Sequence, residues 1–462
     1  MCFVVYSEKF YAIAFVSFFL HGYFSIYIYR QNDHPFKEKN QLLSVFMRRI
    51  LASMLLGAAL FISCKKSKAP DPQPTPPAEI VLGGAVNAAA NATGMASIDA
   101  NVQQQNISGF GGASILQWRG DLTVAQRQKL FSPVDGLGLS VVRVRIPNST
   151  ADFAAEKPTI DAAKSFGAKV IATAWSAPAA MKTNNSLVGG KIKTSSYAEY
   201  AAFLRSYVTA VGGVTAISPT NEPNITVDYE SMLMTAEEVA DFVAAQGDNL
   251  GAPVMAPEPF NMNQTYLNTY LANAAANAKT TYLAGHIYGA APAAFTPGKE
   301  IWMTEHYTNT DDGNGWIGAL GVGKEIHDCM NAGYSMYVWW YMSRYYGLIS
   351  ETADVPTKRG YAMAQYSKWV RPGYRKVNAT ASPQANVFVT AYKSGTKLVL
   401  VIINQNNTMV AQPIGLSGIT TTGFNRYYTD ANSNFKESNF TIPGNNFSIN
   451  LAPLSITTLV AL

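Results

Sequence analysis

Eight short apolar runs, separated by stretches with helical periodicity, lie between Ile107 and Val370. In chain order they read NISGFGG, SVVRVRI, AKVIATAW, TAISPTNEP, APVMAPEP, TYLAGHIYG, KEIWMTEHY and YSMYVWWYM. Runs rich in β-branched and aromatic residues that alternate with helical patterns are typical of a parallel sheet wrapped by helices. Eight such units predict an α/β fold, the (β/α)8 TIM barrel, over residues 106–370.

The pattern changes after Arg371, where residues alternate between polar and apolar and Gly or Asn turns replace the helical period. This alternation is typical of antiparallel strands. Ala96 to Gln105, just before the barrel, also reads as an extended run. We therefore expect an attached side β-sandwich domain at residues 371–462, whose first strands come from a lead-in at residues 80–105.

The first 79 residues resemble targeting sequence rather than a folded domain. Met47 begins MRRILASMLLGAALFISCKK, a basic start and a short apolar run that ends at Cys64. This resembles a lipoprotein signal over residues 47–64, which implies lipidation of Cys64, followed by a proline-rich linker at residues 65–79. Residues 1–46 hold an apolar run, Tyr11 to Tyr29, and are either a start codon placed too early or an N-terminal anchor. We expect an exported lipoprotein on the surface or in the periplasm of a Gram-negative bacterium.

Charge and cysteine content exclude several classes of protein. Charged residues make up 14% of the chain and aromatic residues 12%, and residues 1–64 hold six basic and three acidic residues, so the remainder has a net charge of only +2. Such a balance does not suit a nucleic-acid partner. The three cysteines, Cys2, Cys64 and Cys329, allow no disulfide framework, and the five histidines lack metal-ligand spacing. We expect a monomer without metal or cofactor.

Carboxylates end three of the apolar runs. Glu222 ends the fourth run, Glu258 the fifth and Glu305 the seventh. The active site of a barrel of this type lies at the carboxyl ends of its strands, so these side chains should meet at its mouth. Two facing carboxylates suit hydrolysis of a glycosidic bond, in which one protonates the leaving oxygen and the other attacks or activates water. Glu258 is expected to orient the substrate or the other carboxylates, or to make a structural contact.

Three sequence motifs resemble those of a known family of glycoside hydrolases. The NEP of Asn221 to Pro223 and the EHY of Glu305 to Tyr307 resemble the acid/base and nucleophile motifs of clan A glycoside hydrolases. GFGGAS at Gly109 to Ser114 narrows the resemblance to family 30. That family implies a barrel with a side β-domain, retention of anomeric configuration and no metal. It also implies that Glu222 is the acid/base and Glu305 the nucleophile.

Within family 30, the stretch YVWWYMSRYYG with EHYTNT resembles the glucuronoxylanase subfamily, subfamily 8. There the loop after the eighth strand holds a glucuronic acid branch, which implies binding roles here for Tyr307, Thr310, Trp340, Tyr341, Arg344 and Tyr346. Two positions depart from the subfamily: Ser343 replaces the first of two arginines, and Thr310 replaces a serine. An arginine fork pairs bidentately with a carboxylate, so Arg344 is expected to bind the branch. The alternative for Arg344 is a surface salt bridge.

Further residues are expected to line or support the site. Trp118, Trp175 and Trp340 offer flat faces for sugar rings, although core packing explains each of them equally well. Arg143 and Arg145 alternate with valines, and Arg145, nearer the strand end, is expected to reach Glu305 or to form an ion pair inside the barrel. The remaining candidates are Asn221 beside the acid/base, Tyr288 as a hydrogen-bond donor to Glu305, and His286 on the same side as Tyr288.

Together these features predict a retaining endo-β-1,4-xylanase that cuts glucuronoxylan where a (methyl)glucuronic acid branch directs it. One alternative is a family 30 hydrolase acting on unbranched xylan or on another β-glycan such as β-1,6-glucan. The other is a surface lipoprotein that binds glycans without catalysis.

Overall fold

The computed structural model describes residues 2–7, 10–18, 24–28 and 80–462, in two compact units divided after Ala78. In the first unit, β1 (Cys2–Ser7), β2 (Phe10–Phe18) and β3 (Phe24–Ile28) form an antiparallel sheet. The predicted signal, the linker and Cys64 lie outside the described residues. Among the helices that the structure describes, none combines the length and the apolar character needed to cross a membrane.

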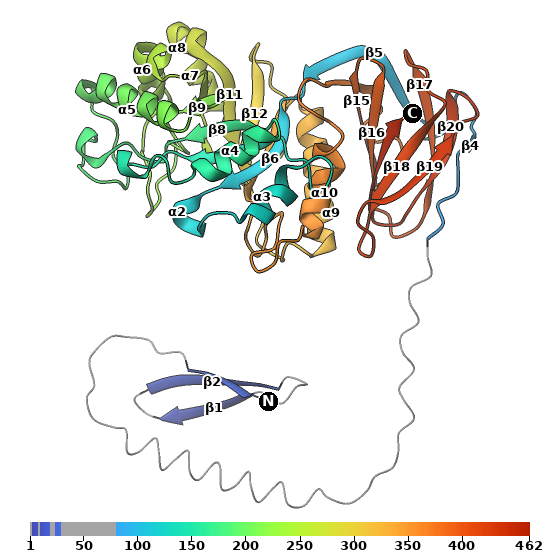
Figure 1. Ribbon diagram of the computed structural model, residues 1–462, viewed down its shortest axis with the longest axis horizontal. Helices are drawn as coiled ribbons and strands as arrows, with labels where there is room; N and C mark the ends of the chain where they lie inside the picture. The colour runs from blue at the N-terminus through green and yellow to red at the C-terminus, as the bar shows by residue number, and fades with distance from the viewer. Residues whose placement is uncertain (1, 8–9, 19–23, 29–79) are drawn as a thin grey trace, which may run out of the picture. The chain divides into compact units, whose positions relative to one another are not determined.

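The second unit contains a closed barrel of eight parallel strands, one from each predicted apolar run (Figure 1). This confirms the predicted TIM barrel. The strands are β6 (Gly109–Ser114), β7 (Val141–Arg145), β8 (Lys169–Thr173), β9 (Ala216–Ser218), β10 (Val254–Pro257), β11 (Thr280–His286), β12 (Glu300–His306) and β13 (Met336–Tyr341).

Helices surround the barrel and bury their apolar faces against it. The helix α6 starts at a capping box, in which the Thr235 hydroxyl accepts the Glu238 N–H and the Glu238 carboxylate accepts the Thr235 N–H. The helices of this unit are α2 (Leu116–Arg119), α3 (Val124–Phe131), α4 (Lys157–Ser165), α5 (Tyr197–Ala210), α6 (Ala236–Gln246), α7 (Gln264–Ala272), α8 (Ala274–Lys279), α9 (Trp316–Asn331) and α10 (Lys358–Ser367).

An apolar plug fills the interior of the barrel. It consists of fully buried side chains from seven of the eight strands: Val141, Ile171, Ala216, Met255, Ala284, Trp302, Met336 and Val338. Because this plug leaves no channel through the barrel, a substrate can reach the interior only from a strand end. In folds of this type the carboxyl end is the one that carries the active site.

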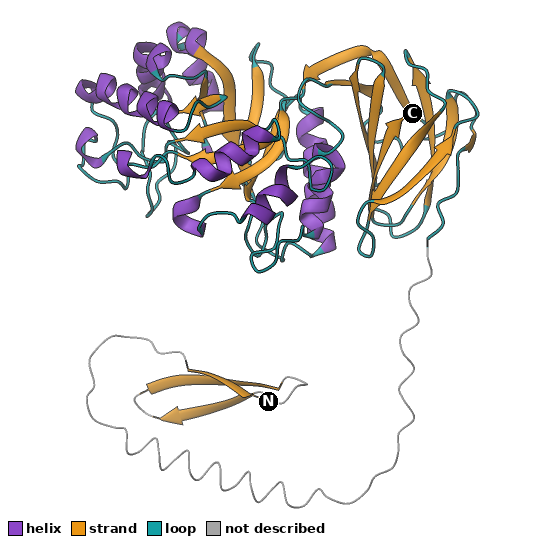
Figure 2. Cartoon of the chain, viewed as in Figure 1, coloured by secondary structure: helices purple, strands orange, loops and turns teal. Residues whose placement is uncertain are grey.

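The side domain is one curled, mainly antiparallel sheet that encloses its own core (Figure 2). Its β5 precedes the barrel in the chain and lies between β14 and β17. The strands, in the order of the sheet, are β19 (Lys436–Thr441), β18 (Gly423–Thr429), β21 (Ser455–Ala461), β16 (Lys397–Asn404), β15 (Val387–Ser394), β14 (Arg375–Ala379), β5 (Ala96–Asn106), β17 (Val410–Ser417), β20 (Asn446–Leu451) and β4 (Val86–Asn87).

Helices α9 and α10 lie between the barrel and the side domain (Figure 1). Gly323 of α9 packs so closely that a Cβ there would lie 2.4 Å from the Ile456 side chain. Just after α10, the Trp369 ring stacks on Tyr427 of the sheet with 4.1 Å between centroids. This contact depends on close packing of large and small side chains, so the side domain forms one body with the barrel.

Candidate active site

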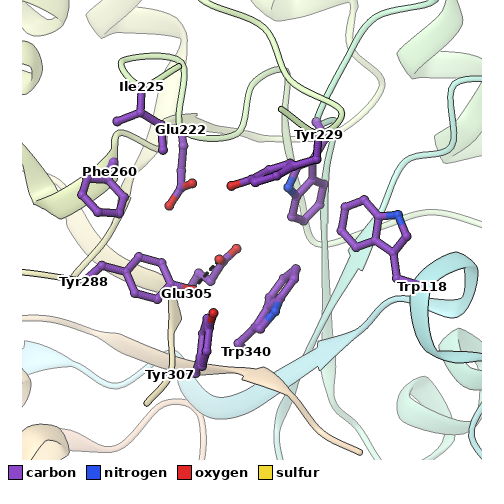
Figure 3. A pocket seen from close by; sticks show the side chains of 10 residues that line it. Trp118, Glu222, Ile225, Tyr229, Phe260, Tyr288, Glu305, Tyr307 and Trp340 are labelled. Carbon is purple, nitrogen blue, oxygen red and sulfur yellow. Dashed lines mark hydrogen bonds between the residues drawn. The ribbon is translucent and has the colours of Figure 1, made fainter. Parts of the chain in front are cut away.

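A cleft of about 580 Å³ opens at the carboxyl ends of the barrel strands (Figure 3). Two carboxylates and a wall of aromatic rings line it. The lining residues are Trp118, Trp175, Glu222, Ile225, Tyr229, Phe260, Tyr288, Glu305, Tyr307 and Trp340. Apolar rings with a few convergent polar groups are the usual composition of a small-molecule or glycan site.

The two predicted catalytic carboxylates face each other in this cleft. Glu305 lies within β12, whereas Glu222 follows β9 on a turn where its own φ is 45° and its N–H donates to the Glu258 carbonyl. Such a positive φ is strained for a side-chain-bearing residue and is a feature of functional sites. One carboxylate oxygen of each glutamate and one ring nitrogen of His286 all lie within 4.8 Å of one another.

Arg143 of β7 is the cation at the centre of the site. Its Nη1 donates to Oε2 of Glu305 over 2.5 Å, and its Nη2 donates to Asn221 over 2.7 Å and to Glu258 over 3.3 Å. The guanidinium is fully buried and lies 4.6 Å from the Trp175 ring centroid. A buried charge is tolerated when it is paired and hydrogen-bonded, and Arg143 satisfies this with two carboxylates and an amide.

Glu305 is held through both of its oxygens. Tyr288 donates its hydroxyl to Oε1 over 2.5 Å, as predicted, while Arg143 occupies Oε2. Burial raises the pKa of Glu305, as does the nearby Glu222 charge, while His286 and Arg143 oppose that rise. Since two donors fix its plane, Glu305 is oriented before any substrate binds, which is the condition for an efficient nucleophile.

His286, at the end of β11, links the acid/base to the core of the site. Its Nδ1 lies 2.8 Å from Glu222 and its Nε2 lies 3.6 Å from Glu258. Burial alone would lower its pKa, but the charge of Glu305, the hydrogen bond to Glu222 and the nearby Glu258 carboxylate raise the pKa to about 9. The imidazole is therefore charged at neutral pH and donates a hydrogen bond to Glu222.

Glu258 is a fixed negative charge beneath the catalytic pair and does not line the cleft. Its oxygens accept from the Thr304 hydroxyl over 2.5 Å and from the Thr173 hydroxyl over 2.8 Å. Burial would raise its pKa, but Arg143, His286 and these hydrogen bonds lower the pKa to about 2. Glu258 therefore stays ionised and orients Arg143 and His286 rather than the substrate.

Of the two roles expected for Arg145, the contact with Glu305 is wrong and the ion pair is confirmed. Arg145 instead forms an ion pair with Glu230, and Arg143 makes the contact with Glu305. Alternation along β7 places both arginines on one face, but Glu305 lies within its own strand, level with the deeper Arg143. Arg145, at the strand end, lies above that level.

Three tryptophans form one wall of the cleft. The Trp118 ring meets Trp175 edge-on at 5.4 Å and Trp340 at 6.3 Å between centroids. Trp118 keeps 39% of its surface exposed, whereas the other two are almost fully buried. Opposite these rings, Phe260 stacks on Tyr288 at 5.6 Å. The exposed faces suit stacking against the C–H patches of sugar rings.

Arg344, in the loop after β13, has no carboxylate partner within residues 80–462. Its guanidinium carbon lies 5.8 Å from the Tyr341 ring centroid, and its Nε is buried without a hydrogen bond. Beside it, Tyr307 stacks on Tyr346 at 4.8 Å. The structure thus brings one uncompensated cation together with three tyrosines, and the alternative of a salt bridge does not hold.

Not every predicted binding residue lines the cleft. Tyr341 packs against Trp340 at 4.6 Å, and Tyr346 lies behind Tyr307, so each supports a lining residue. Asn221 accepts a hydrogen bond from Arg143 and is buried. Thr310 is exposed in the loop after β12. Tyr341, Tyr346 and Asn221 therefore lie against the cleft wall or the catalytic residues, and neither Thr310 nor Arg344 is among the residues that line the cleft.

Three lining residues were missed by sequence analysis: Ile225, Tyr229 and Phe260. Tyr229 lies in a stretch without secondary-structure period, so no pattern placed it at the barrel mouth. Phe260 directly follows the APEP run. Its position just past the end of a strand was the only signal in the sequence that could have placed it in the cleft.

Glu222, His286 and Glu305 are close enough to be considered as metal ligands. However, Arg143 already donates to Glu305, and a charged His286 donates to Glu222. A divalent cation would have to displace or face both positive groups. The donor set therefore suits a pair of catalytic carboxylates better than metal binding.

Comparison with known proteins gives the family. No family model matches the chain. Glucuronoxylanase XynC of Bacillus subtilis (strain 168) is 35% identical over 386 residues, covering 79% of this chain and 91% of the relative. The subfamily 8 xylanase Xyn30A of Clostridium acetobutylicum superposes with a TM-score of 0.75 at 32% identity, over 80% of this chain and 100% of that structure. A GH30 endoxylanase of Clostridium papyrosolvens C71 gives 0.73 at 29% identity, over 79% and 99%. The chain belongs to glycoside hydrolase family 30.

Proposed function

We propose that the protein is a retaining endo-β-1,4-xylanase that hydrolyses glucuronoxylan, directed by the (methyl)glucuronic acid branch. The observation that carries this proposal is the carboxylate pair, Glu222 and Glu305, whose nearest oxygens lie within 4.8 Å in an aromatic cleft. Retaining glycosidases place their carboxyl groups roughly 5 to 5.5 Å apart, and inverting ones roughly 6.5 to 9.5 Å. The short separation and the xylanase relatives support retention.

In this mechanism Glu305 attacks the anomeric carbon while Glu222 protonates the leaving oxygen. Arg143 and Tyr288 hold the Glu305 carboxylate in the plane from which it attacks. When Glu305 becomes an ester it loses its charge, and Arg143 stays compensated because it also bonds Glu258. Glu222 then takes a proton from the water that hydrolyses the ester, so both residues return to their starting states.

The surroundings of Arg344 support recognition of an acidic branch. Its guanidinium lacks a carboxylate partner within residues 80–462 and lies beside Tyr307, Tyr341 and Tyr346. A uronate carboxylate would supply the missing anion, and the tyrosine hydroxyls would donate to its remaining lone pairs. Neutral xylan would gain nothing from this group, so the branch would set the register of cleavage.

The assay that tests this proposal compares glucuronoxylan, debranched xylan, arabinoxylan and β-1,6-glucan as substrates. We expect Arg344→Ala to lower kcat/KM on glucuronoxylan by roughly 10- to 1000-fold and to leave the low activity on debranched xylan unchanged. Arg205→Ala, which removes an arginine on the outer surface of α5, is the matched control.

Three results would contradict parts of the proposal. If the wild type cuts linear xylan as fast as glucuronoxylan, or Arg344→Ala slows both equally, branch recognition fails while the hydrolase remains. If β-1,6-glucan is the better substrate, the assignment of xylan fails. If the wild type hydrolyses none of them, a glycan-binding role replaces catalysis. Glu305→Gln, which should abolish turnover, controls for contaminating hydrolases.

We also propose that the enzyme is an exported monomer held to a membrane by lipid on Cys64. The support is the sequence alone: a basic start and an apolar run that ends at this cysteine, before a proline-rich linker. Metabolic labelling with a fatty-acid analogue should mark the wild type and not Cys64→Ser. Equal labelling of both proteins would refute the site.

A further inference from the structure

A segment of the cleft rim, residues 224–234, carries Tyr229 into the site. Tyr229 is 47% exposed, and its hydroxyl points into the cleft on the side of Glu222 (Figure 3). The segment has no regular secondary structure. Something other than a helix or a strand must therefore hold Tyr229 in place.

The Arg145–Glu230 ion pair holds the rim segment at the position next to Tyr229. Glu230 is the next residue in the chain, and its partner Arg145 is almost fully buried at the end of β7. The same guanidinium lies 5.3 Å from the Trp118 ring centroid, within the range of a cation–π contact. The ion pair thus contacts an aromatic residue of α2 and ends on the residue that follows Tyr229 in the rim segment.

A second buried cation anchors the following residue. Lys182 is fully buried, and its ammonium donates to the Ser231 carbonyl and to the Ser176 hydroxyl, each over 2.7 Å. The Ser231 N–H donates to the Leu187 carbonyl over 3.0 Å, and the Ser231 hydroxyl accepts from the Gly189 N–H. The rim segment is therefore tied to β7 through Glu230 and to the loop after β8 through Ser231.

Neither member of the Arg145–Glu230 pair lines the cleft or bonds Glu222 or Glu305. The ion pair is expected to add little to the stability of the fold, because the desolvation of two buried charges offsets most of their attraction. Its more important effect is geometric, since a buried ion pair fixes the distance between β7 and the rim segment, which carry its two members. The rim segment presents Tyr229 to the cleft, and the Arg145 guanidinium at the end of β7 contacts Trp118 of α2, which lines the same cleft.

We propose that Arg145 and Glu230 are positioning residues that set the spacing of Trp118 and Tyr229, and thereby the affinity for the sugar ring bound between them. They take no part in bond cleavage. This inference rests on the proposed function only for the nature of the ligand, a xylan backbone residue. It predicts a defect in substrate binding without a matching defect in chemistry.

The kinetic test replaces Glu230 by Gln and uses Glu237→Gln, an exposed glutamate seven residues further along, as the matched control. On glucuronoxylan, we expect Glu230→Gln to raise KM by roughly 5- to 20-fold and to leave kcat within about twofold. The control should change neither parameter. On a Trp118→Ala, Tyr229→Ala background, Glu230→Gln should add less than about twofold to KM, because its effect acts through those rings.

A second readout does not need activity. Trp118, Trp175 and Trp340 are close enough for their indole transitions to couple in circular dichroism. Both Trp118→Phe and Glu230→Gln should reduce this coupling, with the folded state retained. If Glu230→Gln does not fold, Arg145→Lys replaces it, since lysine keeps the charge but loses the flat group over Trp118.

The outcomes separate this inference from the proposed function. A wild type that does not cut xylan refutes the function, and the dichroism then still decides the inference. A protein that cuts glucuronoxylan but shows unchanged KM and unchanged dichroism in Glu230→Gln refutes the inference. A fall in kcat equal to the change in kcat/KM also refutes it, because the pair would then act on the chemical step.

Discussion

Replacing Arg143 by lysine should impair the nucleophile without removing the positive charge from the site. The guanidinium bonds Glu305, Glu258 and Asn221 at once, using both terminal nitrogens. A lysine ammonium is a single point on a flexible stem and cannot keep this fork geometry. We expect Glu305 to lose its fixed plane and part of its charge compensation.

The magnitude follows from the burial of the groups. Arg143 and Glu258 are fully buried, and the Glu305 side chain is 8% exposed. Breaking such a pair outright typically costs about 3 to 5 kcal/mol, and the lysine charge recovers part of it. A loss of about 2 to 4 kcal/mol in transition-state stabilisation corresponds to a roughly 30- to 1000-fold fall in kcat/KM.

The pH dependence gives the sharper test. Burial raises the pKa of Glu305, while the charges of His286 and Arg143 lower it. A weaker Arg143 contact therefore raises the pKa of Glu305, so the acidic limb of kcat/KM should move to higher pH. Arg145→Lys is the control, since Arg145 pairs with Glu230 instead. An unmoved acidic limb in Arg143→Lys, or an equal shift in Arg145→Lys, would refute the reasoning.

Three further predictions concern the catalytic roles, the stability and the domain contact. Glu222→Ala should spare substrates with good leaving groups while Glu305→Ala loses turnover on all of them, and equal losses on activated aryl glycosides would refute the roles. His286 has its pKa raised from 6.5 to about 9, so its stabilisation is complete below pH 6.5 and is lost as pH rises through about 9. Thermal melts should show a loss of about 3 kcal/mol across that window in the wild type and not in His286→Gln. Gly323→Val, whose Cβ would meet Ile456 at 2.4 Å, should lower the free energy of unfolding in denaturant by about 1 to 3 kcal/mol with unchanged kcat/KM. If Gly323→Val is as stable as the wild type, the contact between α9 and Ile456 can rearrange without loss of stability, and the prediction is wrong.

The barrel could be predicted from sequence because its strands are buried on both faces. Such strands read as continuous apolar runs, and all eight runs became barrel strands. The exact lengths could not be predicted. β9, for example, contains only Ala216–Ser218, although its run continues to Pro223, because the chain turns there so that Glu222 can face the cleft.

Site residues could be predicted from the sequence where a position at the end of a strand is enough to place them in the cleft. Glu222, Glu305 and Tyr288 follow or end apolar runs, and all three line the cleft. The position of a side chain along the barrel axis was not predictable. Alternation assigns Arg143 and Arg145 to the same face of β7, but it does not tell which of them lies level with Glu305 on another strand. Tyr229 was not predictable because a tertiary ion pair and hydrogen bonds, rather than a local pattern, hold its segment.

The position of β5 in the side domain has a consequence for biosynthesis. This strand is made before the barrel, yet its partners β14 and β17 are made only after the barrel is complete. Until then β5 has unpaired edges, and the sheet cannot close on either side of it. Strands translated after the barrel therefore complete a sheet that includes a strand translated before it, so folding of the side domain depends on long-range contacts. A chain stalled before β14 would leave both edges of β5 unpaired and open to aggregation.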